Sequence, residues 1–163
     1  MLFRSVRRRE VDFGIGPVPD RPGELHSQPL FTEPIVALMK STHPAARKSG
    51  ITLQELSKSP LLRLGASAFR KQLSAAFDQE GIALDSPYEF THVSTMVAMV
   101  EAGLGVAILP SISVPRSRTL KAVPIVRPAM TRTIAVITIR GHTLSPAAAP
   151  FVAMCGALAP PAA

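Results

Sequence analysis

The sequence is poor in cysteine and in aromatic residues. A single cysteine among 163 residues excludes a disulfide framework and a metal site built from several cysteines, and it fits a reducing compartment. With no tryptophan and one tyrosine, recognition of nucleic acid by base stacking is not expected. Hydrophobic residues make up 47% of the chain and charged residues 18%, which excludes a disordered chain and is typical of a globular domain.

The sequence also shows no recognisable targeting signal and no recognisable membrane-spanning segment. The first ten residues lack the apolar core of a secretory signal. The most apolar window, Val93–Pro110, is interrupted by Glu101 and two glycines, so it does not resemble a membrane span. We therefore expect a cytoplasmic protein with no membrane contact.

Acidic residues are absent from both ends of the chain. The net charge of +7 divides into +4 over residues 1–9, −3 over residues 10–101 and +6 over residues 102–163. The bases of the last segment are spread out, whereas nucleic-acid binding normally requires a continuous basic surface. We expect this chain to make no direct contact with DNA.

The sequence also contains few candidate catalytic residues. The four histidines show no metal-ligand spacing, no Gly-x-Ser-x-Gly turn supplies a nucleophile, and no pair of acids is placed for acid–base chemistry. Gly14-Ile15-Gly16 begins a dinucleotide-binding fingerprint but lacks its third glycine. We expect a protein that is not an enzyme and that has no catalytic residues, no metal and no cofactor.

What the sequence does contain is an alternation of strands and helices. Short apolar runs predict strands at Val11–Ile15, Pro34–Met39, Leu61–Leu64, Tyr88–Phe90, Val106–Leu109, Ala122–Val126 and Arg132–Ile139. Caps and apolar periodicity predict helices at Thr52–Leu56, Ser67–Glu80, His92–Ala102 and Pro146–Leu158. This alternation predicts an α/β fold with parallel strand pairing.

Three predicted strand ends are candidates for a ligand site. They are Gly16-Pro17, Gly65-Ala66-Ser67 and Thr91-His92-Val93. In α/β folds small ligands bind outside the carboxyl ends of strands, where helix starts present free amides. Hydroxyl groups beside such amides suit a carboxylate. The alternative is that Ser67 and Thr91 only cap their own helices.

The order of several motifs resembles the effector-binding domain of LysR-type transcriptional regulators. The most distinctive stretch is Met99–Pro110, with the sequence MVEAGLGVAILP. The other motifs, in the family's order, are Val11–Gly16, Pro29–Pro34, His43–Ala46, Thr52–Leu56, Arg132–Val136 and Leu144–Ala148 followed by Phe151. The resemblance covers residues 6–154, and the order and spacing of the motifs carry it.

The resemblance implies a fold like that of type 2 periplasmic binding proteins. Two Rossmann-like α/β subdomains would be joined by two crossing strands, near Ile35–Met39 and Ile134–Ile139. Residues 1–36 and 136–163 would form part of subdomain I, and residues 37–135 would form subdomain II. A small, anionic effector such as an organic acid would lie between them and control DNA binding by a winged helix-turn-helix module. The ligand-binding residues carried over are Gly16, Pro17, Gly65, Ala66, Ser67, Thr91, His92 and Val93.

The sequence departs from the family pattern at its start. No winged helix-turn-helix precedes the matching region, and the opening strands and helices of subdomain I have no counterpart. We therefore expect a chain truncated at its N-terminus, with an incomplete first subdomain and with the Ser67–Glu80 helix available for homo-oligomerisation. Two alternatives are a free-standing solute-binding protein of the same fold and a small α/β enzyme.

Overall fold

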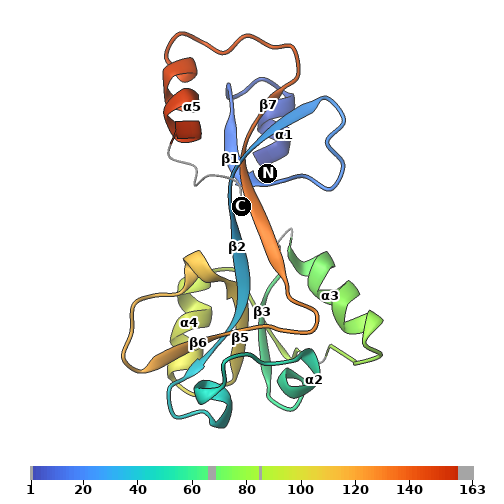
Figure 1. The fold of residues 1–163 in the computed structure, drawn as a ribbon, viewed down its shortest axis with the longest axis vertical. Coiled ribbons are helices and arrows are strands. Elements are labelled where there is room, and N and C mark those ends of the chain that lie inside the picture. The colour runs from blue at the N-terminus through green and yellow to red at the C-terminus, as the bar shows by residue number, and fades with distance from the viewer. Residues whose placement is uncertain (1, 66–68, 85, 158–163) are drawn as a thin grey trace. The chain divides into compact units, whose positions relative to one another are not determined.

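The structure is a computed structural model that describes residues 2–65, 69–84 and 86–157. The chain folds into two compact units (Figure 1). Unit 1 comprises Met1–Glu33 and Arg132–Ala163, and unit 2 comprises Pro34–Thr131. The chain passes between the units within strand β2 (Leu25–Lys40) and at the start of strand β7 (Thr131–Ile139). The ranges expected from the sequence place these passages after residue 36 and before residue 136.

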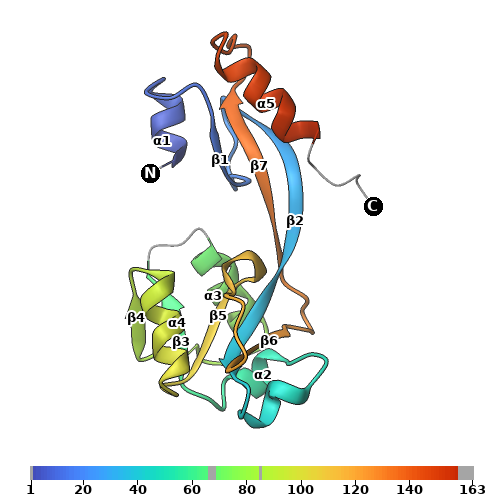
Figure 2. The same ribbon diagram turned by 90° about the vertical axis from the view of Figure 1, so that its left-hand side faces the viewer.

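Unit 1 contains a small sheet with one helix on each face. Strand β1 (Gly14–Pro17) pairs antiparallel with β7, and β7 also neighbours β2. Successive side chains of β7 point to opposite faces, as in any strand. Ala135 and Ile137 pack with Val6 of helix α1 (Leu2–Arg7), whereas Val136 packs with Val152 of helix α5 (Ala148–Ala157). Figure 2 shows the two helices on opposite sides of these strands.

The bounds predicted for the first strand, Val11–Ile15, are wrong, because the strand that forms is β1, Gly14–Pro17, which shares only Gly14 and Ile15 with the prediction. The two glycines at its start allow Leu2 to pack directly on the backbone. A Cβ atom at Gly14 would lie 2.3 Å from Leu2 Cδ1. Gly16 and Pro17 therefore lie inside the strand, whereas the sequence placed them directly after its end. Pro17 is tolerated because β1 is an edge strand, which does not need every N–H for pairing.

Unit 2 is built on a larger mixed sheet. Strand β2 pairs antiparallel with β5 (Val106–Pro110) and with β6 (Leu120–Pro124). Strand β3 (Leu61–Leu64) pairs parallel with β5 on one side and with β4 (Tyr88–Phe90) on the other. The predicted α/β class is confirmed, and among the described strands the predicted parallel pairing holds for β3, β4 and β5 only.

Helices cover both faces of this sheet. On one face, Leu56 of helix α2 (Leu53–Leu56) and Phe77 of helix α3 (Phe69–Gln79) lie in one buried cluster with residues of β2, β3 and β5. On the other face, Met96 and Val100 of helix α4 (Val93–Glu101) pack against Leu62 and Leu109. Two short 3-10 helices, Pro44–Arg47 and Ser111–Ser113, lie in the connections. The sheet of unit 2 is thus sandwiched between helices.

Local signals set most element boundaries in unit 2. β3 and β4 form at the predicted residues, and the predicted ends of the His92–Ala102 helix are the two caps of α4. The predicted capping box is confirmed, since Glu55 N donates to Thr52 Oγ1 and Thr52 N donates to Glu55 Oε2. The predicted N-cap of α3, Ser67, lies outside the described residues.

Besides β1, three elements differ from their predicted ranges by two residues or more. β2 begins at Leu25, nine residues before the predicted Pro34. The prediction missed the first half of the strand because this half contains exposed polar residues and prolines and so does not form an apolar run. β6 occupies Leu120–Pro124, two residues earlier than predicted, since its register with β2 decides the ends. α5 begins at Ala148, two residues after the predicted Pro146, and is described as far as Ala157.

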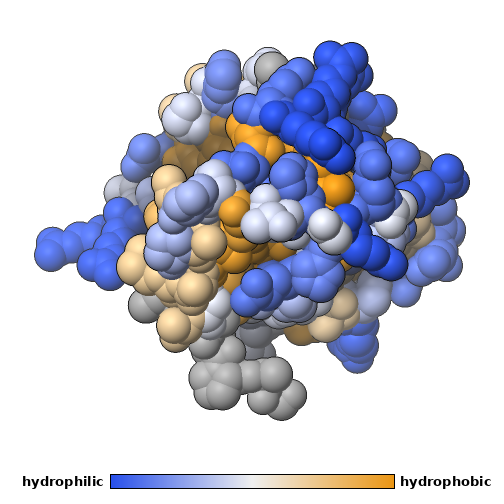
Figure 3. Space-filling model, turned by 90° about the horizontal axis from the view of Figure 1, so that it is seen from above, coloured by the Kyte–Doolittle hydropathy of each residue, from blue (hydrophilic) through white to orange (hydrophobic). Residues whose placement is uncertain are grey.

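Unit 1 exposes a set of large apolar side chains. Each of the following is more than two-fifths exposed: Val11, Ile15, Val18, Phe151 and Met154. Figure 3 shows apolar surface surrounded by hydrophilic residues on the face seen from above. Within the described residues, no helix is long and apolar enough to cross a membrane.

Candidate ligand-binding site

Two of the three predicted groups of site residues lie side by side in unit 2. In the parallel register of β3 and β4, Leu64 lies opposite Phe90. The next residues, Gly65 and Thr91, therefore leave the sheet at the same edge, and Gly65 N donates to Phe90 O at 3.0 Å. This edge is formed by the carboxyl ends of parallel strands, the place where α/β folds hold small ligands.

Gly65 leaves room for the flexible side chain of Glu89. A Cβ atom at this position would lie 2.2 Å from Glu89 Oε1. The same carboxylate is held by Arg63, whose Nη2 lies 2.9 Å from Glu89 Oε2. Arg70 Nη1 donates to Gly65 O at 3.3 Å. Charged groups of both signs therefore surround the end of β3.

The start of α4 leaves backbone donors without a side-chain cap. His92 is the N-cap residue, with an extended backbone (φ −122°, ψ 137°), and its side chain forms no capping hydrogen bond. The alternative function of Thr91, to cap its own helix, is not seen, because no hydrogen bond of its hydroxyl occurs among the described residues. Both side chains are exposed. Within the part of the chain that the structure describes, no side chain caps the first-turn amides of α4.

Val93 follows as the first residue of α4 and is half-buried. Ala66 and Ser67 lie outside the described residues, so the loop between β3 and α3 adds only Gly65 to the described site.

The third predicted group lies in unit 1. Gly16 is buried, its backbone pairs with Ala135, and a Cβ atom there would lie 2.5 Å from Leu2 Cδ2. Pro17 pairs with Ile134 at the end of β1. Packing under Leu2 therefore accounts for the glycine at position 16 without a ligand.

Sequence reasoning missed Arg63 and Glu89, which stand opposite each other in the β3–β4 register. Arg63 Nε is buried and has no hydrogen-bond partner, although the guanidinium contacts Glu89 through Nη2. The signal for both residues was a charged side chain inside a very short strand, directly before the predicted ligand loops. Among the described residues, no group of three or more histidine, cysteine or carboxylate side chains could hold a metal ion.

Comparisons with known proteins agree with this architecture. The family model described as LysR substrate binding domain matches residues 1–160. An uncharacterized HTH-type transcriptional regulator, YbhD of Escherichia coli strain K12, is 33% identical over 155 residues, which are 93% of this chain and 49% of that protein. The chain spans about half the length of the curated relatives it matches.

Solved structures show the same fold. The effector binding domain of QuiR in complex with shikimate superposes with a TM-score of 0.85 and 21% identity, covering 96% of this chain and 76% of that one. The Synechocystis PCC6803 CcmR regulatory domain in complex with 2-PG gives a TM-score of 0.86 and 20% identity, covering 98% and 78%. The fold is thus that of LysR effector-binding domains, which resemble periplasmic binding proteins. With the family model matching nearly every residue, the chain belongs to the LysR substrate-binding-domain family.

Proposed function

We propose that this chain is the effector-sensing domain of a cytoplasmic LysR-type transcriptional regulator and that it binds a small anionic metabolite. Family membership supports a sensing role, and the two neighbouring structures hold small molecules, shikimate and 2-PG. The curated relatives are named as transcriptional regulators, which favours a regulator over an enzyme and over a free-standing solute-binding protein.

The observation that carries the proposal is the uncapped start of α4 beside Gly65. A carboxylate placed there would accept hydrogen bonds from the first-turn amides of α4, and the partial positive charge of the helix end favours an anion. The hydroxyl of Thr91 adds a donor, and the ring of His92 adds a second one. Gly16 and Pro17 remain candidate ligand residues of unit 1 on the family resemblance alone.

Effector binding would act by changing an equilibrium. A ligand that binds one arrangement of the regulator better than another shifts the population toward that arrangement by its difference in affinity. We propose that a helix-turn-helix module outside the 163 residues makes the DNA contact.

A thermal-shift screen of the purified chain against small organic acids tests the proposal. A ligand at a hundredfold its Kd adds about 2.7 kcal/mol, which corresponds to a rise in Tm of about 5 °C or more for a chain of this size. The affected site is then checked with Thr91→Val, which removes one hydroxyl donor and is expected to weaken binding about fivefold. Thr131→Val, an equally exposed threonine on β7, is the matched control and is expected to bind as the wild type does.

We also propose that α3 mediates self-association of the regulator. Lys71, Ala75 and Asp78 are exposed and fall on one face of α3 at spacings of four and three residues. The positive charge stands near the N-terminus of the helix and the negative charge near its C-terminus, an order that opposes the helix dipole and so does not stabilise α3 itself. In an antiparallel pair of α3 helices, Lys71 of each copy would face Asp78 of the other across the small Ala75.

Charge reversal distinguishes this pairing from a purely solvent-exposed face. Lys71→Glu and Asp78→Lys are each expected to shift the mass seen by sedimentation toward the monomer. Mixing the two variants is expected to restore the dimer, because opposite charges again face each other. A wild-type chain that sediments as a monomer at all concentrations would contradict the pairing.

A further inference from the structure

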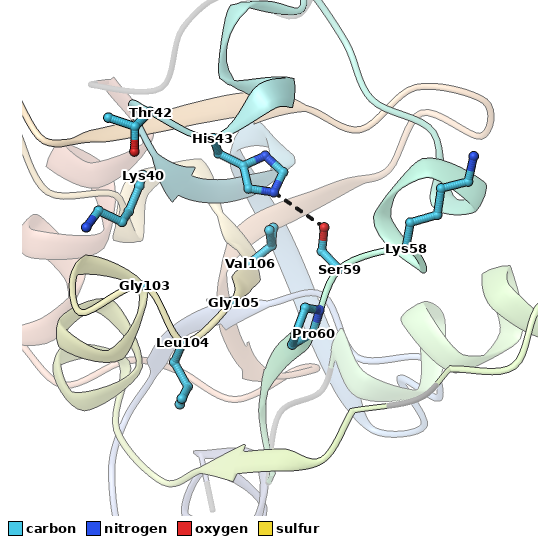
Figure 4. Close-up of a pocket in the computed structure, with 10 residues that line it drawn as sticks. All are labelled: Lys40, Thr42, His43, Lys58, Ser59, Pro60, Gly103, Leu104, Gly105 and Val106. Atoms are coloured by element: carbon cyan, nitrogen blue, oxygen red, sulfur yellow. Dashed lines mark hydrogen bonds between the residues drawn. The ribbon is translucent and has the colours of Figure 1, made fainter.

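Unit 2 contains a cavity of about 240 Å³ at the sheet edge opposite the candidate ligand site (Figure 4). Pro60 directly precedes β3, and Gly105 directly precedes β5. Because β2 runs antiparallel to β5, its last residue, Lys40, reaches the same edge. The cavity therefore lies where the parallel strands begin, whereas Gly65 and Thr91 lie where they end.

Two glycines leave one wall of the cavity without side chains. A Cβ atom at Gly105 would lie 2.2 Å from the backbone oxygen of Pro60, so no side chain fits there. Gly103 has a φ of +88°, a left-handed conformation that favours glycine. The side chain of Lys40 lies beside Gly103, since a Cβ atom there would be 3.6 Å from Lys40 Cδ. Figure 4 shows His43 and Ser59 on the facing side of the cavity.

The hydrogen bonds of His43 direct a hydroxyl donor into the cavity. His43 Nδ1 accepts a hydrogen bond from Ala45 N at 3.2 Å, which places the ring proton on Nε2. Nε2 lies 3.4 Å from Ser59 Oγ and donates to it. Since Ser59 Oγ already accepts from the histidine, its own proton is left to be donated to a ligand.

The charged side chains that line the cavity are both positive. Lys40 and Lys58 belong to the lining, together with the hydroxyl of Thr42, and none of the carboxylates that the structure describes does. Neither lysine forms an ion pair with any residue that the structure describes. In Figure 4 the two ammonium groups stand at opposite sides of the cavity, each at the end of a flexible side chain. Donors and cations without an acceptor favour an anion.

We propose that this cavity is a second ligand site, which binds a small anion of phosphate size, either free or as the phosphate group of a small metabolite. The volume is below the range of about 300–1,000 Å³ that is common for pockets holding drug-sized ligands, so a small group fits better than a large one. Ser59 donates to the anion, and Lys40 and Lys58 close on it from the two sides. The site is independent of the effector residues at the opposite edge of the sheet.

The experiment is an NMR titration of the ¹⁵N-labelled 163-residue chain with inorganic phosphate, at ionic strength held constant with chloride. We expect the amide signals of Ser59, Gly103 and Gly105 to shift with saturation, and those of Thr91 and His92 to stay in place. Lys58→Ala, Lys40→Ala and Ser59→Ala are each expected to weaken phosphate about threefold to tenfold. Arg140→Ala, which removes an exposed cation of unit 1 that does not line the cavity, is the control and is expected to leave the affinity unchanged.

A parallel titration with a phosphate monoester identifies the source of the anion. Tighter binding of the monoester assigns the site to a metabolite, and tighter binding of inorganic phosphate assigns it to the free ion. Shifts that chloride reproduces, shifts confined to Thr91 and His92, or equal losses in Lys58→Ala and Arg140→Ala would overturn the proposal.

Discussion

Arg132 Nε donates to Glu33 Oε1 at 2.7 Å, and Glu33 is only 5% exposed. Glu33 is the last residue of the first segment of unit 1, and Arg132 is the first residue of its second segment. The ion pair therefore ties β2 to β7 at the point where the chain leaves unit 1. A buried carboxylate needs such a partner, because removing a charge from water costs several kcal/mol.

Replacing the cation of this pair should destabilise the chain. We expect Arg132→Met to lower the free energy of unfolding by about 3 kcal/mol, since the Glu33 carboxylate stays buried without its guanidinium. Arg7→Met is the matched control, because Arg7 stands 3.9 Å from Glu24 with both side chains exposed, and it should cost about 0.5 kcal/mol or less. Urea unfolding measures the loss of unfolding free energy in both variants. Equal losses would show that the buried Glu33–Arg132 pair stabilises the fold no more than the exposed Arg7–Glu24 pair does.

The capping box of α2 should give the stability a specific acid dependence. The Lys48 ammonium, which hydrogen-bonds to Glu55, and the amide of Thr52 lower the pKa of the Glu55 carboxyl from 4.5 to about 2. A carboxyl whose pKa is lower in the folded state stabilises the fold above its unfolded pKa, and this stabilisation is lost as the pH falls through the folded pKa.

Comparing wild type with Glu55→Gln isolates this contribution. The difference in unfolding free energy should be constant above about pH 5 and should shrink as the pH falls from 4.5 to about 2. Glu80→Gln, which removes an exposed carboxylate with no bonded partner among the described residues, should show no such trend. A Glu55→Gln difference that does not vary with pH would be inconsistent with the capping geometry.

The contact between Gly105 and Pro60 should make position 105 intolerant of any side chain. Gly105→Ala would place a methyl group against a backbone oxygen that cannot rotate away, and we expect a loss of about 2 kcal/mol in unfolding free energy. In Gly156→Ala, the new methyl meets only the flexible end of Gln28, so the change should be neutral or slightly stabilising. Guanidinium unfolding compares the two, and a tolerated Gly105→Ala would contradict the close approach.

Adding a side-chain cap at the N-terminus of α4 should stabilise the fold. His92→Ser supplies a side-chain acceptor for the first-turn amides, and we expect a gain of about 1 kcal/mol in unfolding free energy. His142→Ser changes an equally exposed histidine in a turn and should have no effect. Were the two variants equally stable, the amides of α4 would already have acceptors.

Much of unit 2 could be predicted from the sequence because local signals decide it. Leu61–Leu64 and Tyr88–Phe90 are short apolar runs bounded by turn residues, and Thr52–Glu55 is a self-contained capping box. Unit 1 was harder, since its strand β1 depends on Leu2 packing over two glycines and on pairing with β7, more than a hundred residues away. Tertiary contacts of this kind override local preference.

The backbone arrangement of the candidate site could be predicted from the sequence, but the pairing of its charged side chains could not. The juxtaposition of Gly65 and Thr91 follows from parallel strand ends, which the alternation of elements indicated. The pairing of Arg63 with Glu89 needs the strand register, which the sequence does not reveal. The cavity needs still more, because Lys40, Ser59 and Gly105 come from three separate segments.

The most direct test of the effector-sensing proposal is calorimetric titration of the chain with the organic acid that stabilises it most, in wild type and in His92→Asp. The substitution puts a negative charge, and an oxygen that competes for the first-turn amides, at the start of α4. Saturable binding to the wild type, weakened about tenfold or more in His92→Asp, is the predicted result. Binding that is equally strong in both proteins, or no binding of any acid, would contradict it.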